Sequence, residues 1–192
     1  VGAYPERIKF SFVIAFSFLW ILFVYAPVTH WIWGGGWLAE MGVLDFAGGL
    51  VVHLTAGTTA LILAFLFGPR EGFPNQVKPP HNPGLTMMGA CMLWVGWFGF
   101  NGGSQLAMGT VSDVADVSRI FANTNAAAAG GAIAAAVATQ LLYKKVDLTM
   151  VLSGALAGLV SITAEPLTPT LGAATLIGGI GGVIVVFAVP LL

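Results

Sequence analysis

Long apolar runs, separated by short polar segments, dominate the pattern of this 192-residue chain. A run without Asp, Glu, Lys or Arg crosses a bilayer as a helix when it holds about 20 predominantly apolar residues. The charge-free windows are 10–39, 46–69, 84–112, 120–143, 148–164 and 166–192. They predict six transmembrane helices near 8–29, 45–67, 85–106, 120–143, 148–165 and 171–192. The window 148–164 is the shortest, and it reaches full length only if the residues after it extend the span.

Composition agrees with this pattern. Hydrophobic residues make up 57% of the chain and charged residues only 8%, whereas a soluble domain carries about 25% charged residues. We therefore expect an all-α membrane protein, with residues 1–192 forming a single transmembrane domain. The chain does not begin with Met and stops inside an apolar run, so we expect an internal fragment of a longer protein.

The basic residues predict an orientation. If every window crosses once, six of the seven Lys and Arg residues lie on one side, and Arg119 lies on the other. The positive-inside rule places the basic side in the cytoplasm. The cytoplasmic segments are then 1–9, 68–84 and 144–147, and the outer loops are 30–44, 107–119 and 166–170. Glu40, Asp113 and Asp116 make the outer side mildly negative, which is compatible with a cationic ligand.

Two stretches of small residues, 126–138 and 178–183, favour close packing between helices. The second stretch, GGIGGV, is a poor nucleotide-binding loop, because no strand precedes it and no Lys-Ser/Thr pair follows it. Cys91 is the only cysteine, which excludes a disulfide framework and a cysteine metal motif. We expect no metal, no cofactor and, without a basic patch, no nucleic-acid partner.

One histidine lies inside the second predicted helix, DFAGGLVVHLTAGTTALILAF. Residues four apart share a helix face, so His53 belongs to a stripe of otherwise small residues: Gly49, His53, Gly57, Ala60 and Ala64. An ionisable group inside a membrane marks a transport pathway or proton relay by default. The alternative is a purely structural hydrogen bond to a neighbouring helix. Asp45, just before the apolar run, is more simply a helix N-cap than a direct ligand.

A second unusual stretch is WVGWFGFNGGSQL, residues 94–106. Helical spacing puts Trp97, Phe100, Asn101 and Ser104 on one face, next to a smooth surface formed by glycines. An aromatic belt at the membrane boundary would explain a Trp or two, but explains less well the aligned Phe, Asn and Ser. In the outer segment HWIWGGGW, Trp33 precedes three glycines that would let it fold over a pore mouth. Aromatic faces attract cations.

The segments DFAGGLVVHLTAG, GPR, KPPHNP and GWFGFNGGS resemble the signature segments of the ammonium transporter (Amt/MEP/Rh) family, most closely its Amt branch. The resemblance covers essentially the whole chain. It implies an inverted-repeat fold of about eleven transmembrane helices, of which this chain corresponds to the fourth to ninth. It also implies a homotrimer in which each subunit has its own pore, in the cell membrane.

The resemblance further implies roles for five residues. Trp33 and Ser104 match the outer site that recruits ammonium, and Asp45 matches the acid that supports this site. Phe100 matches the inner ring of a two-Phe gate, and His53 matches the first of two pore histidines. Both partners, a Phe and a His, belong to helices outside this chain. The expected function is to recruit ammonium, deprotonate it and conduct ammonia through an apolar pore.

Three functional classes remain open. The signature segments favour a transporter, whereas an ammonium sensor on the same fold would share every residue quoted above. An intramembrane enzyme is the weakest candidate, because Asp45 and His53 are not spaced for contact and no nucleophile motif is present. The loop 68–84, with Arg70, Lys78 and His81, is expected to be irregular. It is either a solvated connector or, as in many bacterial relatives, part of a docking surface for a PII-type regulatory protein.

Overall fold

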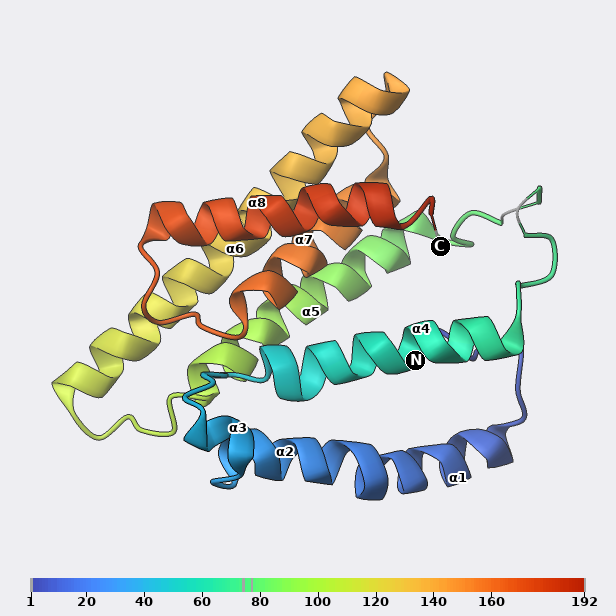
Figure 1. The fold of residues 1–192 in the computed structure, drawn as a ribbon. Coiled ribbons are helices and arrows are strands. Elements are labelled where there is room, and N and C mark those ends of the chain that lie inside the picture. Colours follow the sequence, from blue (N-terminus) through green and yellow to red (C-terminus); the bar gives the residue numbers. More distant parts are fainter. Residues whose placement is uncertain (1, 74, 77, 192) are drawn as a thin grey trace. The chain divides into compact units, whose positions relative to one another are not determined.

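The computed structural model describes residues 2–73, 75–76 and 78–191, and every regular element in them is a helix (Figure 1). The predicted all-α fold is therefore confirmed. The chain divides into two compact units, residues 1–81 and 82–192, which are described separately below.

The first unit contains two long helical segments. One runs through α1 (Phe10–Trp20), the π-helical segment η1 (Ile21–Tyr25) and α2 (Ala26–Trp33), and the short α3 (Trp37–Glu40) follows it. The other runs through the π-helical segment η2 (Gly49–Leu54) and α4 (Thr55–Phe67). The two segments are antiparallel, since Phe12 near the start of α1 meets Phe67 at the end of α4, with ring centroids 6.1 Å apart. Further along, Trp20 Nε1 donates a hydrogen bond to Thr59 Oγ1 at 2.8 Å.

The second unit contains four helices: α5 (Pro83–Gly103), α6 (Val111–Tyr143), α7 (Leu148–Ile162) and α8 (Leu171–Ala188). Helices α6, α7 and α8 pack against one another through glycine and alanine. A Cβ atom at Gly158 of α7 or at Gly178 of α8 would overlap the carbonyl oxygen of Ala127 in α6. One turn along α6, Gly154 and Gly182 approach Gly131 in the same way. This confirms the packing role predicted for 126–138 and 178–183, because only glycine allows backbones so close.

Five of the predicted six spans are long and apolar enough to cross a membrane by length and composition. The sixth, α7, has 15 residues and extends only about 22 Å, against a hydrocarbon core of roughly 30 Å. After α7 the backbone is irregular, and its polar groups need partners there. Asn123 of α6 supplies them, because its buried Nδ2 donates to the carbonyl oxygens of Pro166 at 2.9 Å and Pro169 at 2.8 Å.

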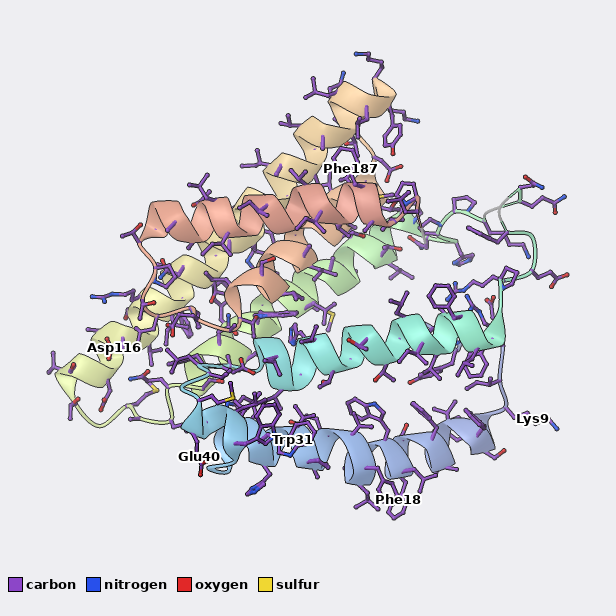
Figure 2. The ribbon with its side chains drawn as sticks, viewed as in Figure 1. Lys9, Phe18, Trp31, Glu40, Asp116 and Phe187 are labelled. Atoms are coloured by element: carbon purple, nitrogen blue, oxygen red, sulfur yellow. The ribbon has the colours of Figure 1, made fainter. Side chains whose placement is uncertain are left out.

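Several predicted helix ends are wrong. The first helix continues to Trp33 instead of ending at 29, and the second begins at Gly49 instead of Asp45. The largest error concerns α6, which begins at Val111 and not at 120. Asp113 and Asp116 therefore lie on a helix and not in a loop, and Figure 2 shows Asp116 projecting from the early turns of α6. The 33 residues of α6 extend about 50 Å, so its first turns reach past a hydrocarbon core of roughly 30 Å.

The loop predicted over 68–84 is irregular, as expected, from Gly68 to Asn82 within the described residues. Helix α5 begins at Pro83, where Asn82 accepts a hydrogen bond from the backbone N–H of Leu85 at 3.0 Å. Arg7 Nη1 donates to the carbonyl oxygen of Gly68 at 2.8 Å, which satisfies one of the orphan carbonyls at the end of α4.

Candidate functional site

The carboxylate of Asp45 organises the loop before the histidine-bearing helix. Its Oδ1 accepts from the backbone N–H of Gly48 at 3.0 Å, and its Oδ2 accepts from Leu50 at 3.0 Å and Val51 at 2.8 Å. The side chain is buried, with 7% of its surface exposed. Asp45 is therefore not the N-cap residue as predicted, since that position is Gly48, but its carboxylate accepts from the first N–H groups of the helix as an N-cap would.

Gly48 makes this arrangement possible. Its φ of 98° lies in the left-handed region that glycine tolerates. A Cβ atom there would lie 2.7 Å from Cγ2 of Val52 and 3.4 Å from Cη2 of Trp33. The loop therefore closes tightly between the first turn of η2 and the indole of Trp33, with no room for a side chain.

Trp33 is the last residue of α2 and not part of the predicted loop. Its Nε1 donates to the carbonyl oxygen of Asp45 at 2.6 Å. Because the indole N–H is engaged by the backbone, the ring has a fixed direction while 45% of the side chain remains exposed. The glycines after it form the turn, since the N–H groups of Gly34 and Gly36 both donate to the carbonyl oxygen of His30.

His53 lies in the π-helical segment η2 and is half-buried. The carbonyl oxygen of Gly48 accepts from both Val52 at 2.9 Å and His53 at 3.0 Å, which is where the π-helical spacing begins. Thr55 Oγ1 then donates to the carbonyl oxygen of Val51 at 2.6 Å. π-Helical turns inside helices are rare and occur frequently at functional sites. The predicted small-residue stripe is open at Gly57, where an added Cβ would meet nothing within 4 Å.

Phe100 and Trp97 form an aromatic pair on α5. Their ring centroids are 5.7 Å apart and their planes are inclined at 48°. The Phe100 side chain is 40% exposed. Trp97 Nε1 donates to Thr163 Oγ1 at 2.9 Å, which connects α5 to the end of α7.

Ser104 ends α5, and its Oγ donates to the carbonyl oxygen of Phe100 at 2.9 Å. The hydroxyl proton is thereby directed back at the helix, and the lone pairs of the oxygen face away from that bond. A serine held in this way is oriented to accept a hydrogen bond from a donor such as a cation N–H.

Asn101 differs from its predicted neighbours on this face. It is wholly buried, and its Nδ2 donates to Oγ1 of Thr124 in α6 at 3.0 Å. Gly102 lies against the ring of Phe121 of α6, so this side of α5 packs on α6. Asn101 is thus part of the contact between α5 and α6, while Phe100 and Ser104 lie on a more exposed side.

The structure brings Trp33, Asp45 and the start of η2 together in the first unit, and Trp97, Phe100 and Ser104 together in the second. Sequence reasoning missed Thr163 and Thr124, which hold Trp97 and Asn101. Threonines in apolar segments are common, and their sequence gives no signal of a partner on another helix. In the described part of the chain, no group of three or more His, Cys, Asp or Glu residues is placed to hold a metal ion.

Comparison with known proteins gives a consistent result. The sequence model of the Ammonium Transporter Family matches residues 1–192. The chain is 46% identical to ammonium transporter Amt1 of Archaeoglobus fulgidus over 183 residues, which cover 95% of this chain and 45% of that protein. The crystal structure of Candida albicans Mep2 superposes with a TM-score of 0.90 at 35% identity, covering 99% of this chain and 42% of that one.

A second similar structure is a sensor Amt protein, with a TM-score of 0.90 and 36% identity, covering 98% of this chain and 48% of that chain. The chain thus spans less than half the length of these relatives. The five apolar helices and these relatives indicate part of a multi-pass membrane protein. With the family match over its full length, the chain belongs to the ammonium transporter family.

Proposed function

We propose that the full-length protein recruits ammonium at Trp33 and Ser104, passes it beyond Phe100, and conducts it past His53 as ammonia. The observation that carries this proposal is the place of His53. It is a half-buried imidazole on a π-helical turn in an otherwise apolar helix that is long enough to span a membrane. An ionisable group within a membrane-spanning segment marks a transport pathway or a proton relay by default.

The chemistry follows from the cost of charge. An ammonium ion is expensive in a narrow apolar conduit, whereas ammonia is neutral and can still form hydrogen bonds. A neutral imidazole both donates and accepts, so His53 can hold ammonia midway through such a conduit. By resemblance, a second histidine outside this chain would touch it and take part in handing over the released proton.

Recruitment is supported by how the two outer side chains are held. The indole of Trp33 is fixed through its N–H, which leaves its face available to a cation. Such an attraction contributes roughly 0.5–2 kcal/mol. The oxygen of Ser104 is left as an acceptor because its proton is directed to the carbonyl oxygen of Phe100. Phe100 itself, braced by Trp97, is proposed as the inner gate ring.

Replacing His53 with alanine tests the central step. We expect ammonium-dependent flux through liposomes containing the full-length protein to fall about tenfold, the effect of losing one hydrogen-bonding group of roughly 1.4 kcal/mol. Leu54→Ala is the matched control, because this neighbour belongs to the same π-helical turn but its side chain is exposed. An unchanged rate and selectivity in His53→Ala, in protein that still assembles, would rule out a conducting role for His53.

Replacing Trp33 with leucine tests recruitment. We expect the KM for ammonium to rise about 2- to 30-fold with little change in maximal flux, because a cation–π contact of roughly 0.5–2 kcal/mol is lost. Trp37→Leu is the control, since Trp37 is also largely exposed, at 53%, but its ring packs on Trp31 and, among the described residues, no hydrogen bond joins it to Asp45. Trp37→Leu should keep the parent's KM. If Trp33→Leu also keeps that KM and the parent's discrimination between ammonium and sodium, Trp33 does not bind the cation.

A sensor is the second candidate function, favoured by the similarity to a sensor Amt protein at the same TM-score as Candida albicans Mep2. Both functions would use the same outer site. Flux measurements on the full-length protein separate them, because a sensor would bind ammonium at Trp33 and Ser104 without net transport.

The remaining partners are proposed from the resemblance. We expect a homotrimer in the plasma membrane. On the side proposed as cytoplasmic, we propose that the exposed Arg70 and Lys78 meet carboxylates of a PII-type regulator. In the structure, Arg70 Nη2 donates to the carbonyl oxygen of Gly2 at 2.5 Å. Charges at such a rim chiefly set association rate and salt dependence.

A further inference from the structure

A buried threonine at the end of α7 forms two successive hydrogen bonds. Thr163 is fully buried, and its Oγ1 donates to the carbonyl oxygen of Leu159 at 2.6 Å. The same Oγ1 accepts from Nε1 of Trp97 at 2.9 Å. Because the hydroxyl proton is committed to Leu159, the oxygen presents its lone pairs to the indole. The hydroxyl therefore holds the indole of Trp97 in a single orientation.

The direction of Trp97 matters for Phe100. The two rings lie 5.7 Å apart on successive turns of α5, inclined at 48°. A tilted aromatic contact at this distance is favourable and depends on the angle between the rings. If the indole turned away from Thr163, its N–H would lose an acceptor where water is scarce, and Phe100 would lose the surface against which its ring is inclined.

We propose that Thr163 is a positioning residue for Phe100, acting through the indole of Trp97. Thr163 holds the indole, the indole supports one face of the Phe100 ring, and the ring keeps a single orientation. This inference rests on the proposed function only in taking Phe100 as a gate ring. The chain of contacts from Leu159 to Phe100 lies entirely within the second unit.

The alternative is that Thr163 only joins α7 to α5. The chain offers a matched control for this possibility. Thr139 of α6 is also fully buried, and its Oγ1 donates to the carbonyl oxygen of Ala135, four residues earlier, at 2.9 Å. Thr139→Val thus removes the same kind of intrahelical bond as Thr163→Val, without touching Trp97. Thr163→Ser keeps the hydroxyl and should restore the parent's behaviour.

The decisive experiment uses the full-length protein with 4-fluorophenylalanine at position 100 and fluorine NMR. We expect one narrow resonance in the parent, in Thr163→Ser and in Thr139→Val. In Thr163→Val, we expect the resonance to broaden or split as the ring samples several orientations. An unchanged resonance in Thr163→Val, or an equal change in Thr139→Val, would overturn the inference.

Flux measurements connect the ring to discrimination. In Thr163→Val, the rate ratio of ammonium to dimethylammonium is expected to fall about three- to fivefold, the range for losing one hydrogen bond between membrane helices. A changed resonance with an unchanged ratio would overturn the role at the gate. If the parent itself carries no ammonium, the proposed function fails, and the NMR comparison still decides whether Thr163 positions Phe100.

Discussion

Replacing Gly178 with alanine is expected to destabilise the second unit by about 1–3 kcal/mol or more, the cost of forcing an extra methyl group into a packed contact. A Cβ atom at Gly178 would overlap the backbone of Ala127, with 2.5 Å to its carbonyl carbon and 2.6 Å to its Cα. A backbone cannot rotate aside as a side chain can. Helix α6 cannot retreat either, because Gly158 of α7 presses on the same carbonyl group.

The next residue supplies the control. At Gly179, an added Cβ would find its nearest neighbour, Cβ of Ala134, at an ordinary 3.8 Å. Gly179→Ala should therefore be neutral or stabilising by up to about 1 kcal/mol, since alanine favours the helix. The measurement is the thermal unfolding midpoint of the detergent-solubilised full-length protein. Equal midpoints for the two variants would show that α6 and α8 do not meet at Gly178 as closely as described.

Among the described residues, hydropathy located every long helix, but it missed the short α3 and the ends of several helices. Helix α6 is the clearest case, because Arg119 set the start of the apolar window at 120, whereas the helix already begins at Val111. Asp113 marks the start of this helix instead of ending an apolar span. Its carboxylate accepts from the N–H of Thr110 at 2.9 Å, and its own N–H donates to Thr110 Oγ1 at 3.1 Å. This capping box is readable in the sequence. A search for apolar windows alone overlooks this capping box, because such a search finds the residues that suit lipid and not the full length of a helix.

The π-helical turn at His53 has no such local signal. It depends on Gly48 at positive φ and on the distant carboxylate of Asp45, which together displace the helix start to Gly49. Hydropathy and helical spacing singled out His53, Phe100 and Ser104 as candidates, whereas their specific roles came only from the resemblance to a family. Their supports, such as Thr163 for Trp97, depend on contacts between helices that a linear pattern does not contain.

Replacing Asp45 with alanine is expected to have the largest effect on the first unit. Three backbone N–H groups, those of Gly48, Leu50 and Val51, would lose their acceptor at once in a buried place. Each donor left without an acceptor costs roughly 1–3 kcal/mol, so we expect the free energy of unfolding to fall by at least about 3 kcal/mol. The negative charge that favours the helix N-terminus would also disappear. Because the carbonyl oxygen of Asp45 receives the indole N–H of Trp33, the proposed recruitment site at Trp33 should be disordered as well.

Two further variants make this prediction specific. In Asp45→Asn, the side-chain amide can adopt either orientation, but its NH2 group is a donor and would face a backbone N–H, which is also a donor. We therefore expect a loss of unfolding free energy smaller than that of Asp45→Ala. Asp147→Ala is the matched control, because that carboxylate also starts a helix but is exposed and accepts one backbone N–H, from Met150 at 2.9 Å. Removing the Asp147 carboxylate should lower the free energy of unfolding by only about 1 kcal/mol. The order expected in unfolding midpoints is parent, Asp147→Ala, Asp45→Asn and Asp45→Ala, from highest to lowest. If Asp45→Ala unfolds no earlier than Asp147→Ala, the carboxylate does not hold the loop, and its support of Trp33 is wrong as well.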